Sequence, residues 1–164
     1  MSDSHARFSE FPKTIKASSA DAGHTYRLVD THFAVHGAAP ASGSTVDFPA
    51  GRISVYPAER LGDMSGDAAR TPVYSLAKGG TLAVPTGLVF VRLAEGHKLD
   101  AHAAPFRAAG YEIAQSMAHA PNAGWLRAAS SSVAASLSGL DRLAAIPGVE
   151  NVVPQMLSQV ARMR

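Results

Sequence analysis

An alternation of short β-type and helical stretches between residues 88 and 153 is the feature that most restricts how this chain folds. Residues 88–93 form a nearly continuous apolar run of the length of a buried strand. Later β-type stretches follow at 111–117, 125–129 and 149–153, with Pro121-Asn122-Ala123-Gly124 as the expected turn between the second and third. Four strands are therefore expected in this part of the chain.

The first helical stretch lies between the first two strands. Leu99, Ala103 and Phe106 recur at helical spacing, and Gly110 occupies the position of a C-terminal cap. Pro105 would cost about 3 kcal/mol inside a regular helix, because its ring replaces the N–H and clashes with the preceding turn. A kink or a late helix start is therefore expected here.

The second helical stretch precedes the last strand. Ser131 or Ser132 is the expected N-cap, and Pro147-Gly148 is the expected stop. The whole order is β-α-β-β-α-β, which places two helices on one face of a four-stranded antiparallel sheet. The apolar side chains expected in the core are Val89, Val91, Leu99, Phe106, Ile113, Leu137, Leu140, Leu143, Val149 and Val152.

The rest of the chain is less regular. Residues 1–23 are polar and irregular, which predicts a flexible arm outside the fold. Residues 24–85 are short β segments interrupted by glycine and proline, including a hairpin around Lys78-Gly79-Gly80. The predicted fold class is α+β, with a small β-rich unit (24–85), a ferredoxin-like unit (86–154) and a C-terminal tail (155–164).

Composition and charge exclude several kinds of partner. Lys and Arg number 15 against 13 Asp and Glu, which leaves a net charge of +2 and no clustered basic footprint. We therefore expect no nucleic-acid and no membrane partner. The chain has no cysteine, which excludes thiolate catalysis and cysteine-based zinc sites. The absence of a long apolar run predicts a cytoplasmic protein.

The sequence favours a protein that is not an enzyme and has no cofactor. No nucleophile elbow, dinucleotide fingerprint or phosphate-binding loop occurs, and serines 130–132 are expected to start a helix. The closest histidines are His32 with His36 and His97 with His102. Residues four apart on an extended strand lie about 13 Å apart, too far to share one ion, so no metal site is expected.

The same element order also builds RNA-recognition domains. Val89-Phe90-Val91 weakly imitates their first-strand aromatic pattern, but the third strand offers only Trp125. A lone tryptophan is more typical of a core or an interface, so the RNA interpretation is the weaker one.

Three segments resemble the propeptides of subtilisin-like serine proteases and the stand-alone inhibitors that share their fold. They are residues 87–93 (GLVFVRL), residues 109–113 (AGYEI) and residues 140–154 (LDRLAAIPGVENVVP), in the family's order and spacing. The resemblance implies a protein that binds, chaperones or inhibits such a protease, in cis as an excised propeptide or in trans as a separate inhibitor.

The resemblance also implies two contact regions. The open face of the sheet would dock on the protease, here with Trp125 and Arg127, while the segment after the last strand would lie in the active-site cleft. The residues expected in the cleft segment are Gln155, Ala161, Arg162, Met163 and Arg164. The alternative is a structural or assembly module that uses the same face for a homo-oligomer or a non-protease partner.

Overall fold

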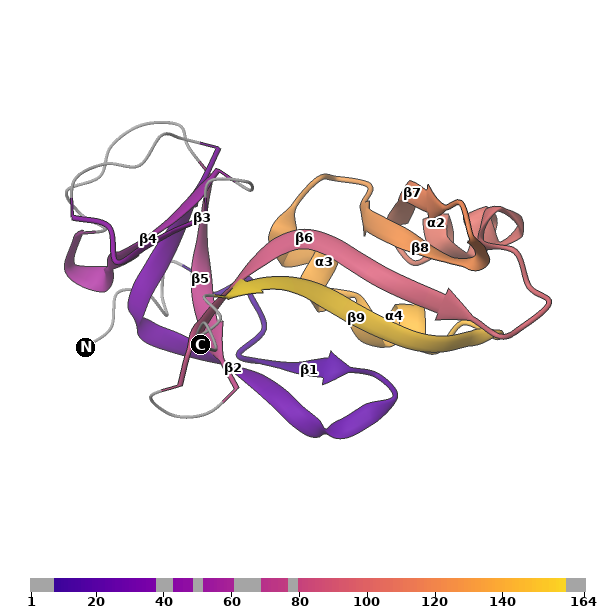
Figure 1. Ribbon diagram of the computed structural model, residues 1–164, viewed down its shortest axis with the longest axis horizontal. Coiled ribbons are helices and arrows are strands. Elements are labelled where there is room, and N and C mark those ends of the chain that lie inside the picture. Colours follow the sequence, from indigo (N-terminus) through magenta and orange to yellow (C-terminus); the bar gives the residue numbers. More distant parts are fainter. Residues whose placement is uncertain (1–7, 38–42, 49–51, 61–68, 77–79, 159–164) are drawn as a thin grey trace. The chain divides into compact units, whose positions relative to one another are not determined.

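The protein is a mostly antiparallel β-sheet structure with few and short helices, so it is broadly α+β (Figure 1). The structure is a computed structural model that describes residues 8–37, 43–48, 52–60, 69–76 and 80–158. Its strands are β1 (Thr14–Ser18), β2 (Asp21–His36), β3 (Val46–Phe48), β4 (Ile53–Pro57), β5 (Ala69–Ser75), β6 (Leu82–Leu93), β7 (Tyr111–Met117), β8 (Ala120–Ala128) and β9 (Val149–Ser158). Its helices are the 3-10 turns η2 (Ala58–Arg60) and η3 (Leu99–His102), and α2 (Ala103–Ala108), α3 (Val133–Ser138) and α4 (Leu140–Ala144).

The chain divides into two compact units. Unit 1 takes in Met1–Lys13, Tyr26–Thr86 and Met156–Arg164, and unit 2 takes in Thr14–Thr25 and Gly87–Gln155. The division after Thr86 lies one residue from the predicted boundary at 85/86. The division falls inside β6, which continues from Leu82 to Leu93 and supplies residues to both units, and β2 and β9 are divided between the units in the same way.

In unit 2 the strands follow the order β9-β6-β8-β7, and the β6–β8 and β8–β7 pairs are antiparallel. Alternate residues of the strands point to one face, where they meet η3, α2 and α4. The fully buried cluster on this face contains Val89, Val91, Leu93, Leu99, Phe106, Ala109, Tyr111, Leu126, Leu143 and Val152. Ile113, Leu140 and Val149 pack against it while half-buried, so the expected core is largely found.

The two helical stretches have local causes that were visible in the sequence. Pro105 is the third residue of α2, and the four residues before α2 form η3, so the regular helix starts late as expected. The Ser132 hydroxyl accepts a hydrogen bond from the Ala135 N–H at 3.2 Å, which confirms Ser132 as the N-cap of α3. The second stretch breaks at Gly139 into α3 and α4.

The predicted turn at residues 121–124 is wrong, because these residues lie inside β8 and the turn is at Ala118-His119. Gly124 is required by close approach to the neighbouring strand and helix. A Cβ there would lie 2.6 Å from the Gln115 carbonyl oxygen and 2.4 Å from Leu99 Cδ2. The Asn122 side chain donates a hydrogen bond to the Leu93 carbonyl oxygen at 2.8 Å, so it links the two central strands β8 and β6 instead of forming a turn.

Unit 1 contains the strands β3, β4, β2 and β5, hydrogen-bonded in that order, and the start of β6. The predicted hairpin between β5 and β6 is present, since Tyr74 pairs with Ala83 and Ser75 with Leu82. One face of this sheet holds the cluster Ala34, Ile53, Val55, Val73 and Val84. The opposite face is also buried, because Phe33 and Tyr56 are fully covered neighbours with ring centroids 5.8 Å apart.

The prediction that residues 1–23 lie outside the fold is wrong for the part that the structure describes. Phe8, Phe11 and Ile15 are buried, and residues 14–18 form β1. The Tyr74 hydroxyl donates to the Pro12 carbonyl oxygen at 2.7 Å, and the Leu28 N–H donates to the Lys13 carbonyl oxygen at 2.8 Å. The sequence gives no sign of this packing, because Phe8 and Phe11 stand in a polar segment that has neither helical nor strand periodicity.

The predicted end of the last strand is also wrong. β9 continues past Val153 to Ser158, so Gln155 is a half-buried strand residue and does not begin a free tail. Leu157 packs against the apolar cluster of unit 1. The four other predicted tail residues, Ala161, Arg162, Met163 and Arg164, lie outside the described residues.

We expect Leu143→Ala to lower the free energy of unfolding of unit 2 by about 2–5 kcal/mol, because it empties a fully buried site between α4 and the sheet. Leu140→Ala should cost less, since Leu140 is half-buried. Urea unfolding followed by the fluorescence of Trp125, the single tryptophan, reports on this unit. Leu76→Ala, at an exposed site, is the control, and an equal midpoint shift for it and Leu143→Ala would contradict the packing described.

We expect Gly124→Ala to destabilise unit 2 by about 1–3 kcal/mol, because the added methyl group meets backbone that cannot move freely. The same fluorescence-detected unfolding curve measures it. An unchanged midpoint would mean that β7 and η3 shift without cost, in which case close approach is not the reason for this glycine.

Candidate functional site

The best candidate site is the face of the unit 2 sheet that points away from the helices, called here the open face. Since Val89, Val91 and Leu126 face the helices, their strand neighbours point to the other side. The open face comprises Leu88, Phe90, Arg92, Glu112, Gln115, Trp125 and Arg127. It therefore includes both side chains that the sequence predicts as partner contacts, Trp125 and Arg127.

An aromatic pair lies on the two central strands of this face. Phe90 on β6 is directly opposite Trp125 on β8, with ring centroids 5.2 Å apart and ring planes inclined by 66°. Both side chains are half-buried. Edge-to-face packing holds each ring in one orientation, so the pair forms a preformed apolar feature that a partner surface can cover.

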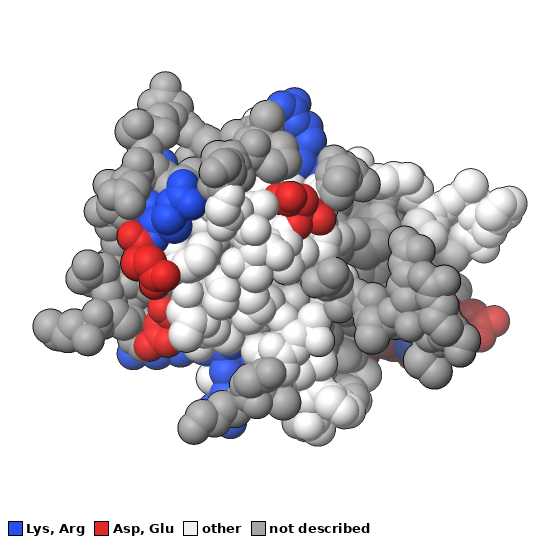
Figure 2. All heavy atoms as spheres, turned by 60° about the vertical axis from the view of Figure 1, so that its left-hand side comes forward, with Lys and Arg blue, Asp and Glu red and all other residues white. Residues whose placement is uncertain are grey.

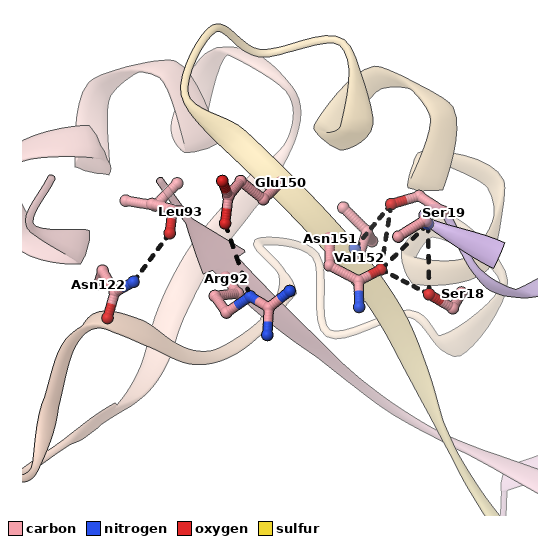
Figure 3. A network of polar contacts seen from close by, with 9 residues as sticks. Ser18, Ser19, Arg92, Leu93, Asn122, Glu150, Asn151 and Val152 are labelled. Atoms are coloured by element: carbon pink, nitrogen blue, oxygen red, sulfur yellow. Dashed lines mark hydrogen bonds and ion pairs between the residues drawn. The ribbon is translucent and has the colours of Figure 1, made fainter. Parts of the chain in front are cut away.

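Two ion pairs lie on the strands around the aromatic pair. The Arg127 guanidinium donates through Nε and Nη2 to Glu112 Oε2 at 3.0 and 2.9 Å, across the β7–β8 ladder. Arg92 Nε lies 3.8 Å from Glu150 Oε1, joining β6 to β9, as Figure 3 shows. All four side chains are about half exposed, so each pair contributes at most about 1 kcal/mol to stability.

The paired charges of the open face bear on the kind of partner that this face can bind. Each arginine of the open face already faces a carboxylate, so the face has no uncompensated cationic cluster for a phosphate backbone. A single aromatic pair with compensated charge around it is typical of a protein interface, where anchors pack in the middle and polar groups form the rim. Figure 2 brings forward another side of the molecule, where β3 and β4 lie in Figure 1, and there described acidic and basic side chains lie beside one another next to an uncharged area.

The outer edge strand β7 is irregular. Its register with β8 shifts between Ile113 and Gln115 and again between Ser116 and Met117. These irregularities leave Gln115 and Met117 exposed, although regular alternation from Tyr111 would place both on its buried face. Bulges of this kind discourage strand addition to an edge. Binding through this unit therefore favours the open face over the β7 edge.

The histidines do not form a metal centre among the described residues, where no group of three or more ligating side chains meets. His32 and His36 hydrogen-bond to different threonines, Thr31 and Thr71, each at 2.8 Å. His97 and His102 do come together, with ring centroids 5.4 Å apart, and the His102 Nε2 contacts the Pro147 carbonyl oxygen at 3.3 Å. Burial lowers the pKa of His36 to about 4.

The sequence alone did not identify the partners of the predicted contact residues. In the sequence Phe90 belongs only to a weak aromatic pattern, and nothing marks Glu112, Arg92 or Glu150 as contact residues. Their roles depend on the register between strands, which places Phe90 opposite Trp125 and Glu112 opposite Arg127. The one signal in the sequence for these pairs is the alternation of apolar side chains along each strand, which restricts the register between the strands.

No protein-family model matches the chain, and neither the curated proteins nor the solved structures that were searched contain a match. No helix within the described residues is long and apolar enough to cross a membrane.

We expect the stability of the protein to fall as the pH is lowered from about 6.5 toward about 4, in part because of His36. Its pKa is 6.5 when unfolded and about 4 when folded, so in this range the unfolded chain binds more protons and acid favours unfolding. Urea unfolding by far-ultraviolet circular dichroism at several pH values measures this slope. His36→Gln should flatten it, whereas His119→Gln, at an exposed turn, should leave it unchanged; equal slopes for both variants would contradict the assignment.

Proposed function

We propose that this protein is a non-enzymatic binding module that docks the open face of unit 2 on a subtilisin-like serine protease, as a propeptide, folding chaperone or inhibitor. The observation that carries the proposal is the Phe90–Trp125 pair on the two central strands, with the paired charges of Arg92 and Arg127 on the same face. Such a face suits a protein surface better than a nucleic acid or a small ligand.

The arrangement of unit 2 supports the ferredoxin-like interpretation on which the family resemblance depends. Its elements follow the order strand, helix, strand, strand, helix, strand, and its sheet follows the order β9-β6-β8-β7. Two interleaved βαβ units produce this order, with both helical layers on one face. The opposite face is then the surface that the resemblance assigns to the protease.

The proposed cleft segment starts later than the sequence predicted. Because β9 includes Gln155 and extends to Ser158, the substrate-like peptide of this proposal begins after Ser158. In this proposal Arg164 and Ala161 occupy the first and fourth specificity pockets, and main-chain pairing supplies the affinity.

A second function, an assembly module, is favoured by the charge balance of the same face. Because both arginines are internally paired, the face presents little net charge that would repel another copy of itself. An isologous contact between two open faces would bury Phe90 and Trp125 of each copy. Light scattering of the purified protein distinguishes the two functions.

We expect the full-length protein to inhibit a subtilisin-like protease, and Trp125→Ala to raise the inhibition constant about tenfold or more because it removes the central anchor. Arg127→Glu should also weaken inhibition, by placing two carboxylates opposite each other. The double variant Glu112→Arg with Arg127→Glu restores the ion pair with its charges exchanged. Recovered inhibition would mean that the single variant acted by disturbing local order, and continued loss would mean that the protease recognises the charge at residue 127. Leu76→Ala is the matched control, exposed and outside the open face.

Two further outcomes decide the proposal. Removal of residues 159–164 should weaken inhibition while leaving the unfolding curve unchanged, and Arg164→Asp should weaken it for a protease whose first pocket accepts a long basic side chain. Equal inhibition constants for wild type and Trp125→Ala would rule out docking through the open face. A stable homo-oligomer that does not inhibit the protease, and that dissociates in Trp125→Ala, would establish the assembly function instead.

A further inference from the structure

The outer edge of β9 is covered by the chain's own turn between β1 and β2. The Ser19 N–H donates to the Val152 carbonyl oxygen at 3.0 Å, and the Val152 N–H donates to Ser19 Oγ at 2.8 Å (Figure 3). The N–H and C=O of one residue in an antiparallel ladder point to the same side. Since β9 also pairs with β6, Ser19 occupies the edge of β9 that faces away from the sheet.

Asn151 holds this turn in place. Its Oδ1 accepts from Ser18 Oγ at 2.6 Å, from the Ala20 N–H at 3.2 Å and from Ser19 Oγ at 3.4 Å. One side-chain oxygen thus collects three donors from three successive residues, and both parts belong to unit 2. The turn therefore satisfies both backbone groups of Val152, one through the Ser19 N–H and one through the Ser19 hydroxyl, and Asn151 fixes it in place.

Proline closes the next position along the same edge. The alternation of a strand places Pro154 two residues beyond Val152 with the same orientation, and proline has no N–H to offer to another strand. The sequence around it, Val149-Glu150-Asn151-Val152-Val153, is rich in β-branched residues and carries one charge. An unguarded strand of this composition is prone to pair with its own kind.

We propose that the Ser18–Ala20 turn is a guard of the β9 edge, and that its removal exposes β9 to antiparallel pairing with β9 of a second copy of the chain. A second copy is the occupant because this segment has three β-branched valines and a single charge, and each copy offers the same edge to the other. The role is independent of the proposed protease binding, which uses the open face and not this edge.

The experiment uses the full chain with Ser19→Ala and Asn151→Ala combined, which removes the acceptor for Val152 and the anchor of the turn. Hydrogen exchange of the Val152 amide should accelerate about tenfold relative to wild type. Light scattering over a range of concentrations should show a dimer that wild type does not form. Ser19→Thr keeps the hydroxyl and should retain the wild-type exchange rate, whereas Ser138→Ala, which loses a hydroxyl bonded within α3, should change neither readout.

The absence of cysteine from the chain allows the strand in contact to be identified. In the proposed pairing Val152 of one copy is hydrogen-bonded opposite Glu150 of the other, which places the two copies of residue 151 directly opposite each other. Asn151→Cys combined with Ser19→Ala should therefore give a disulfide-linked dimer under mild oxidation. Ser138→Cys should not give one. Unfolding curves for each variant show that the chain remains folded, and if the double variant unfolds, Ser19→Ala alone supplies the exchange measurement.

Several results would overturn the proposal. A Val152 amide in wild type that exchanges as fast as an open strand edge would show that the turn does not guard β9. Faster exchange in the variant without a dimer would show that the edge opens but does not pair with a second copy. A dimer that leaves Asn151→Cys unlinked would place the contact elsewhere.

Discussion

Strand β6 supplies the side chains on which both surfaces of unit 2 depend. It pairs with β9 on one side and β8 on the other, and its alternate residues Val89, Val91 and Leu93 are fully buried against the helices. That burial fixes the register of the strand, because a slip of one residue would move every apolar side chain to the other face. Phe90 and Arg92 are consequently held on the open face, opposite Trp125 and beside Glu150. The burial of the core residues therefore also fixes which side chains lie at the candidate site.

The two edges of the unit 2 sheet are protected against the addition of another strand, each by a different feature. At β7 the register shifts twice, which breaks the ladder that another strand would extend. At β9 the Ser19 backbone and hydroxyl satisfy Val152, and Pro154 removes a donor. Because both edges are protected in this way, the open face with Phe90 and Trp125 is the surface of unit 2 that we propose for a partner. Association by the face and association by an edge are separate properties, governed by different residues.

The N-terminal segment shows how far local pattern can mislead. Residues 8–20 contain few apolar side chains and no helical or strand periodicity, so they resemble a linker. Phe8, Phe11 and Ile15 are nevertheless buried, and Ser18 and Ser19 hold the last strand of the chain more than 130 residues away. Local pattern also misleads at residues 121–124, whose residue types are typical of a turn but which lie in strand β8. The glycine at 124 is explained by the neighbouring strand, because a side chain there would meet the Gln115 carbonyl oxygen. In both cases the decisive contact is distant in the sequence.

The sequence by itself determined the elements whose cause is local. The late start of α2 at Pro105, the Ser132 cap, the β5–β6 hairpin and the buried alternation of β6 all follow from rules that act over a few residues. The family resemblance in the sequence also predicts Trp125 and Arg127 as contact residues, and the structure places both side chains on the open face. Only the tertiary structure decided what stands beside them, that Phe90 faces Trp125, that Glu112 pairs with Arg127 and that Ser19 covers Val152. Register and edge contacts join residues far apart in the chain. They are set by the burial of the alternate residues on the helix side and by the hydrogen bonds of the assembled sheet, which no local pattern encodes.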